Sequence, residues 1–99
     1  MAKFALLVEL KAKPGKELEV EAFLEKEAGL VRGEPGTLSW HAAKVEGEPG
    51  VYRIFDTFND EAARESHFNG EAGQELAANA ERLLSVAPKI YRLQVVAEK

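Results

Sequence analysis

The sequence contains no cysteine, which excludes disulfide bonds, thiolate nucleophiles and cysteine-based metal sites. Histidine is also scarce: the chain has two, His41 and His67, and they fall on different predicted elements. No carboxylate cluster has the spacing of metal ligands, and no glycine-rich phosphate loop follows a strand. We therefore expect neither a metal ion nor a bound cofactor.

Acidic residues outnumber basic ones, seventeen to thirteen. The net charge of -4 leaves no basic patch, which argues against nucleic acid as a partner. The apolar run Phe4–Val8 ends at Glu9 and is too short for a signal-peptide core or a membrane span. We expect a cytoplasmic protein without membrane contact. Its 99 residues predict one domain, residues 1–99, small enough to gain stability from association.

A repeated tetrapeptide organises the middle of the chain. Gly33-Glu34-Pro35-Gly36 recurs as Gly47-Glu48-Pro49-Gly50 and brackets the alternating stretch Thr37–Glu46. Proline presets φ for a tight turn, and glycine supplies the positive φ that a type II turn needs next. A second β-rich run, Val51–Phe58, follows the latter turn. The two runs predict a β-hairpin.

Helical and strand patterns flank this hairpin. Strand-like alternation covers Phe4–Lys11, and a helical apolar stripe runs from Lys16 to about Val31, with its glutamates interpreted as a solvated face. A second helix, capped by Asn59 or Asp60, runs to about Phe68, breaks at Asn69-Gly70 and resumes to Leu84. A last strand begins after Pro88.

The order β-α-β-β-α-β predicts an α+β, ferredoxin-like fold with both helices on one face of a four-stranded antiparallel sheet. The helix-covered face should carry Phe4, Leu6, Val8, Leu10, Leu38, Trp40, Tyr52, Ile54, Phe58, Tyr91, Leu93 and Val95. The open face should carry Leu7, Ala43, Val45, Val51, Phe55, Ile90 and Val96, interleaved with Glu9, His41, Arg53, Arg92 and Gln94. Because this face is too apolar for a solvated sheet, we expect a homodimer joined through it.

Several motifs carry a family resemblance. Lys13-Pro14-Gly15, Glu34-Pro35-Gly36, the run from Asp56 to Ala62, and His67 together resemble the antibiotic biosynthesis monooxygenase (ABM) superfamily. Its members are small ferredoxin-like chains that pair into dimeric α/β barrels. The resemblance places Asp56 at the family's acid position and His67 at its histidine. Phe58 replaces a frequent tryptophan and the first strand lacks an asparagine, so haem cleavage is not expected.

The resemblance implies a cofactor-free monooxygenase acting on a small aromatic or quinol-type metabolite. His67 would take a proton from the substrate, Asp56 would hold the histidine, and Trp40, Tyr52 and Phe58 would contact the aromatic ring. By strand alternation, Asp56 shares a face with those three aromatic residues. A histidine beside a carboxylate in an apolar pocket is suited to act as a general base.

Other interpretations stay open. Related barrels include isomerases and lyases of small hydroxy-ketones or lactones, and the scarcity of polar residues is also compatible with a non-catalytic, ligand-binding dimer. His67 can be a structural histidine, and Asp56 can pair with an arginine or cap the next helix. Trp40 and Tyr52 can be core residues whose polar atoms find a partner.

Overall fold

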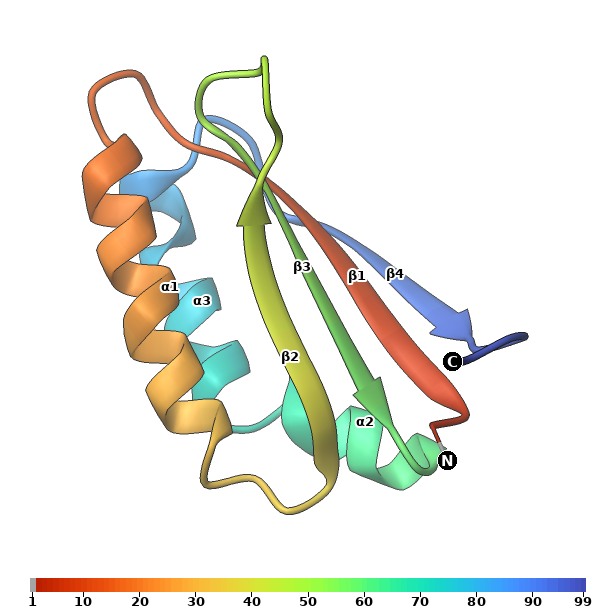
Figure 1. Cartoon of the computed structure of the whole chain (residues 1–99). Coiled ribbons are helices and arrows are strands. Elements are labelled where there is room, and N and C mark those ends of the chain that lie inside the picture. The colour runs from red at the N-terminus through yellow and green to blue at the C-terminus, as the bar shows by residue number, and fades with distance from the viewer. Residues whose placement is uncertain (1) are drawn as a thin grey trace.

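The computed structural model describes residues 2–99, and Figure 1 shows its helices and strands. In chain order the elements are β1 (Phe4–Lys11), α1 (Glu17–Val31), β2 (Thr37–Lys44), β3 (Val51–Phe58), α2 (Glu61–Phe68), α3 (Glu71–Leu83) and β4 (Lys89–Gln94). The β-α-β-β-α-β order predicted from the sequence is confirmed, with its second helical region divided into α2 and α3. None of these helices is both long and apolar enough to cross a membrane.

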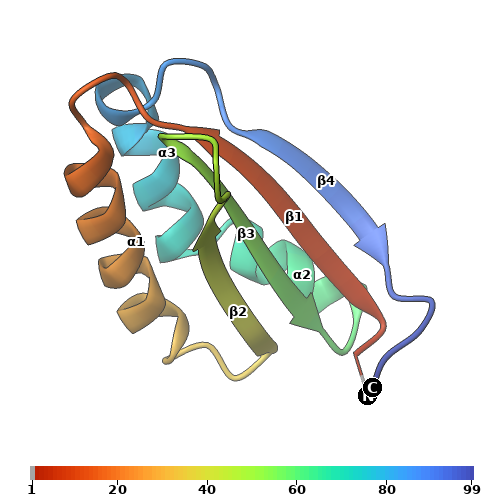
Figure 2. The same ribbon diagram turned by 45° about the horizontal axis from the view of Figure 1, so that its top comes forward.

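The four strands form one antiparallel sheet in the order β2-β3-β1-β4. Helices α1 and α3 run side by side along one face, and α2 lies against the same face near the end of β3 (Figures 1 and 2). The opposite face is covered by no element of residues 2–99. The sequence prediction of one helix-covered face and one open face is confirmed.

Apolar side chains from the sheet and two helices form the core. The stripe on α1 buries Val20, Leu24 and Val31, as its helical spacing predicts. Val20 and Leu24 belong to the same buried cluster as Val8 and Ile54 of the central strands. Removing this surface from water is the main force that holds the helices on the sheet.

The start of α2 follows its sequence signal. Asp60 has an extended backbone, and its Oδ1 accepts a hydrogen bond from the backbone N–H of Ala63 at 2.8 Å. This bond satisfies one of the unpaired donors of the first helical turn. The predicted cap at Asp60 and the break at Asn69-Gly70 are both confirmed.

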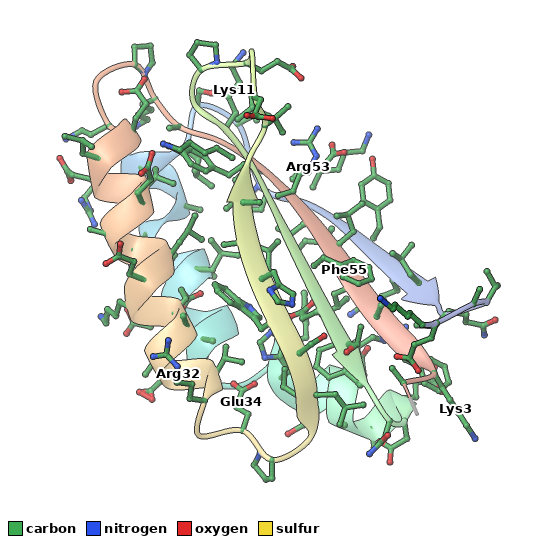
Figure 3. The ribbon with its side chains drawn as sticks, in the orientation of Figure 1. Lys3, Lys11, Arg32, Glu34, Arg53 and Phe55 are labelled. Carbon is green, nitrogen blue, oxygen red and sulfur yellow. The ribbon has the colours of Figure 1, made fainter. Side chains whose placement is uncertain are left out.

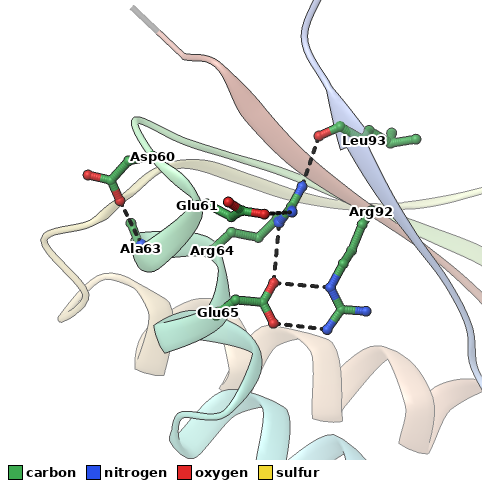
Figure 4. Close-up of polar contacts among 7 residues, drawn as sticks. All are labelled: Asp60, Glu61, Ala63, Arg64, Glu65, Arg92 and Leu93. Carbon is green, nitrogen blue, oxygen red and sulfur yellow. Dashed lines mark hydrogen bonds and ion pairs between the residues drawn. The ribbon is translucent and has the colours of Figure 1, made fainter.

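A buried arginine fixes α2 to the sheet (Figure 4). The Arg64 side chain is 7% exposed, and its Nη1 donates to the backbone carbonyl of Leu93 in β4 at 3.1 Å. Its guanidinium also lies 5.1 Å from the centre of the Phe4 ring and pairs with Glu61 and Glu65. These contacts hold α2, and with it His67, at a set position over the strands.

The face assigned to β4 from the sequence was wrong. Val8 lies opposite Ile90 and Leu6 lies opposite Arg92, so Ile90 and Arg92 share the helix-covered side with Leu6 and Val8. Arg92 makes two 3.0 Å hydrogen bonds to Glu65 of α2 (Figure 4) instead of facing outward. A one-residue change of strand register moves every side chain to the other face, and alternation alone does not set that register.

Two further corrections concern β2 and its preceding turn. The pairing of β2 with β3 is irregular between Thr37 and Ser39, and Leu38 is 46% exposed instead of covered by helices. Gly47 and Gly50 adopt the positive φ expected of turn glycines, with values of 83° and 78°. Gly36 does not, so the first tetrapeptide forms a different turn from the second.

Candidate active site

His67 lies in the last turn of α2, with its ring between two carboxylates. Its Nδ1 is 2.5 Å from Oε1 of Glu34, and its Nε2 is 2.9 Å from Oδ2 of Asp56. The imidazole is nearly enclosed, since its side chain is 9% exposed. Both ring nitrogens are therefore engaged, one by the loop before β2 and the other by the centre of the sheet.

Asp56 supplies the carboxylate on the sheet. It sits on β3 with 1% of its surface exposed, and burial raises its pKa against the opposing effect of the hydrogen bond from His67. Its second oxygen, Oδ1, has no hydrogen-bond partner within residues 2–99. A buried acceptor without a partner is costly, so this atom marks a place where a ligand group would be stabilised.

The protonation of His67 follows from its neighbours. Burial alone would lower its pKa, but the hydrogen bonds to Asp56 and Glu34 outweigh burial and raise it. A neutral ring has one N–H and would leave the other nitrogen facing a carboxylate oxygen without a proton between them. The doubly protonated imidazolium donates to both carboxylates, so we assign the charged form.

Glu34 was missed as a site residue because the sequence analysis used it only as part of a turn. Its Oε1 also accepts a hydrogen bond from Oγ1 of Thr37 at 2.8 Å, which orients the carboxylate before β2 begins. Figure 3 shows Glu34 in the loop between α1 and β2. No local sequence signal connects it with His67, which lies 33 residues further along the chain.

Beside this triad, a cavity of about 470 Å³ lies between the sheet and the helices. It is lined by Leu6, Val8, Glu27, Trp40, Ile54, Asp56, His67, Phe68, Asn69, Ala72, Gly73, Gln74, Leu76, Ala77, Pro88 and Ile90. Most of these residues are apolar, and the volume suits a small organic molecule. Among residues 2–99, no three histidine, aspartate or glutamate side chains are grouped as a metal site.

The interpretation of the α1 glutamates as a solvated face was wrong for Glu27. It is 3% exposed, it lines the cavity, and its Oε2 has no hydrogen-bond partner within the described chain. Burial raises its pKa to about 7. The sequence did carry a signal, because Glu27 follows Val20 by seven positions and Leu24 by three, on the helix's apolar stripe.

The structure brings three of the five predicted site residues to this cavity. Trp40 lines it from β2, directly opposite Asp56 on β3, and His67 lines it from α2. Phe58 is fully buried, and its ring centre lies 5.4 Å from that of His67 without lining the cavity. Phe58 thus packs against the histidine and does not face the space where a ligand would sit.

Tyr52 lies outside this cavity. It is four residues from Asp56 on β3, which separates the two by about 13 Å along an extended strand. Its hydroxyl donates to Oε2 of Glu21 at 2.7 Å, and burial together with this bond raises the pKa of Tyr52 to about 12. Tyr52 instead lines a separate groove between α1 and β2 that Trp40 also borders.

The sheet, the helix layer and the histidine held between two carboxylates define a small ferredoxin-like α+β domain with a partly open cavity between its layers. Residues 3–79 match the family model described as antibiotic biosynthesis monooxygenase, and the chain belongs to that family. The resemblance noted from the sequence is confirmed. A search among curated proteins found no match.

Solved structures share the fold over nearly the whole chain. NE2512 of Nitrosomonas europaea, a protein of unknown function, is 42% identical over 100% of this chain and 94% of its own, with a TM-score of 0.94. PA3566 of Pseudomonas aeruginosa is 25% identical over 98% and 97% of the two chains, with a TM-score of 0.84. A candidate antibiotic biosynthesis monooxygenase of Caulobacter crescentus is 25% identical over 97% and 92%, with a TM-score of 0.85.

Proposed function

We propose that this protein is a cofactor-independent monooxygenase that acts on a small aromatic or quinol-type metabolite. The observation that carries the proposal is that Asp56, which lines a mostly apolar cavity beside the His67 imidazolium, has one oxygen, Oδ1, without a hydrogen-bond partner. Such a site is suited to removing a proton from a bound hydroxyl. Family membership supports the same reaction class.

We propose the reverse of the roles expected for His67 and Asp56. His67 has no free ring nitrogen, because Glu34 and Asp56 occupy both. The free lone pairs belong to Asp56, whose raised pKa makes it a stronger base than an exposed aspartate. In this proposal Asp56 takes the proton, and His67 orients it and stabilises its charge.

The reaction balances without a further reductant. Loss of the hydroxyl proton to Asp56 gives a phenolate, which passes one electron to O₂ and leaves a phenoxyl radical and superoxide. These two combine at a ring carbon that bears hydrogen, and protonation gives a hydroperoxide. Loss of water then leaves a carbonyl group. One oxygen atom enters the product and the other becomes water, with all four electrons supplied by the substrate.

We further propose a homodimer in which the open sheet faces meet. Phe55, Leu7 and Tyr91 lie in one row across β3, β1 and β4 on that face, and Phe55 is 42% exposed. In Figure 3 the Phe55 and Arg53 side chains stand over the sheet, away from α1. The neighbouring row pairs Arg53 with Glu9 at 3.6 Å, so a second copy would meet an apolar strip beside charges of both signs.

An oxygen-uptake assay tests the proposed reaction. The protein is mixed anaerobically with phenols and quinols that carry a free ring C–H, and ¹⁸O₂ is then admitted. We expect faster oxygen uptake than in buffer and one labelled oxygen atom in the product. Asp56→Asn should lower the rate by about a hundredfold or more. If no compound reacts faster than in buffer, or if Asp56→Asn keeps full activity, the proposal fails.

A second function follows from the two carboxyl groups of the cavity. Glu27, with a pKa of about 7, holds a proton in much of the population at neutral pH, while Asp56 offers a free oxygen. An acid and a base in one cavity suit proton transfer in an isomerase or lyase acting on a hydroxy-ketone or lactone. Turnover that continues without oxygen would favour this function, and ligand-induced thermal stabilisation without turnover would favour a binding protein.

A further inference from the structure

Two residues that line the cavity from different elements, Asp56 and Glu27, each carry a carboxyl oxygen without a hydrogen-bond partner in the described chain. Oδ1 of Asp56 belongs to the sheet and Oε2 of Glu27 to α1, and neither has a hydrogen-bond partner within residues 2–99. Asp56 is 1% exposed and Glu27 is 3% exposed. Burying a polar oxygen without a hydrogen bond destabilises the fold. A bound molecule with two suitably placed polar groups would supply the missing hydrogen bonds to both oxygens.

The charge of the cavity wall restricts what that molecule can be. No lysine or arginine of the described chain lines the cavity. The one cation, the His67 imidazolium, is already offset by Asp56 and Glu34. An anionic ligand would therefore enter a site with excess negative charge, where repulsion is only weakly screened.

We propose that Glu27 is a specificity-determining residue: it binds the second hydroxyl of an uncharged aromatic diol whose first hydroxyl faces Asp56, and the site rejects diols that carry an additional anionic substituent such as a carboxylate. The inference rests on the proposed function in taking this cavity as the substrate site.

A hydroxyl group matches Glu27 better than other oxygen groups. It can donate to a carboxylate and can also accept from a carboxylic acid, so it pairs with Glu27 in either protonation state. Both states are populated near neutral pH, because the pKa of Glu27 is about 7. A methyl ether only accepts, and it also needs more room. The walls formed by Leu6, Ile54 and Trp40 supply apolar contact for the ring.

A matched set of four naphthalenes tests the ligand class. Binding is measured anaerobically by calorimetry with naphthalene-1,4-diol, 4-methoxynaphthalen-1-ol, 1,4-dimethoxynaphthalene and 1,4-dihydroxy-2-naphthoate. We expect each lost hydroxyl to weaken binding by about tenfold, since it leaves a buried acceptor without a donor. The carboxylated diol should bind at least about tenfold more weakly than the neutral diol.

Two variants of α1 test whether the second hydroxyl of the diol binds Glu27. In Glu27→Met, the preference for the diol over its monomethyl ether should fall from about tenfold to below about threefold, because the acceptor is gone. Glu25→Met, two positions away and exposed, should keep the tenfold preference. Circular dichroism and thermal denaturation check that both variants fold.

Several results would overturn the inference, including some obtained with the wild-type protein alone. These are a diol that does not bind at millimolar concentration, a dimethyl ether that binds as tightly as the diol, or a carboxylated diol that binds best. The inference would also be overturned if Glu27→Met kept the full tenfold preference for the diol over its monomethyl ether. Because binding is measured without oxygen, a diol that binds in the expected order but is not oxidised in air defeats only the monooxygenase proposal.

Discussion

Gly36 packs directly against Ala63: a Cβ atom built at Gly36 would lie 2.9 Å from the Cβ of Ala63. This contact joins the loop that carries Glu34 to the helix that carries His67. The contact therefore fixes Glu34 and His67, the two partners of one hydrogen bond, relative to each other. Only glycine lets the loop come this close to α2. Gly36 is required for packing and not for the turn conformation that its tetrapeptide suggests.

Gly36→Ala should separate α2 from this loop. We expect the added methyl group to lower the free energy of unfolding by about 1–3 kcal/mol, as overpacking does elsewhere. Each kcal/mol lowers the melting temperature by about 4–8 °C in a domain of this size. Gly29→Ala is the matched control, because nothing lies within 4 Å of a Cβ at that helical position. It should stabilise the protein, and equal melting temperatures for the two variants would contradict the packing role.

Replacing His67 with phenylalanine should destabilise the fold through the carboxylates it leaves behind. Phenylalanine keeps an aromatic ring, although a larger one, and Asp56 and Glu34 lose their shared partner. We expect a loss of about 3 kcal/mol at pH 7, measured by chemical denaturation, because an unpaired buried charge is costly. The loss should shrink at pH 4, where the carboxylates take up protons. The double variant with Asp56→Leu should recover part of it, and an equal loss at both pH values would argue against the charged His67.

Stability should fall as the pH rises from 5 to 8. The pKa of Glu27 is raised from 4.5 to about 7, so over that range the folded state keeps a proton that the unfolded chain has lost. The raised pKa of His67 acts in the same direction: the stability from its charged form is complete below 6.5 and is lost as the pH passes the folded pKa.

Glu27→Gln isolates the first of these contributions. At pH 5 the variant should match the wild type, because an amide resembles the protonated carboxyl. At pH 8 it should be more stable by about 2 kcal/mol, since it carries no charge to bury. Thermal denaturation at the two pH values measures the difference. A variant that is less stable than the wild type at pH 8 would show that the Glu27 carboxylate is stabilised by a partner.

Phe55→Glu should dissociate the proposed dimer. Light scattering of the wild type at micromolar concentration should give twice the chain mass of 10.9 kDa, and the variant should give 10.9 kDa, because it places a charge in the apolar row. Leu18→Glu is the control: Leu18 is 82% exposed on α1, away from the open face, and its replacement should leave the mass unchanged. A folded wild type with the mass of one chain would refute the dimer.

Local signals predicted the elements well. The turn at Gly47–Gly50, the cap at Asp60 and the break before α3 all depend on residues within a few positions of one another, and the structure contains each of them. The β4 register lacked such a signal. Ile90 and Tyr91 are both apolar, so alternation fits either face, and pairing with β1 decides which one is covered.

The site was only partly predictable for the same reason. Asp56 and His67 were identified through family motifs, whereas Glu34 and Glu27 were interpreted as a turn residue and a surface charge. The burial of Glu27 could have been predicted from helical periodicity, because this residue continues the apolar stripe of α1. The contact of Glu34 with His67 could not have been predicted in this way, since it forms only when the loop before β2 packs on α2.

The sequence by itself determined the order of strands and helices and the presence of an unpaired sheet face, because short-range periodicity, caps and turns specify these features. Only the tertiary structure decided which of the seventeen acidic residues meet His67 and which remain without a partner in the cavity. The physical reason is that burial and hydrogen bonding set the chemistry of a carboxyl group, and both depend on neighbours distant in the chain.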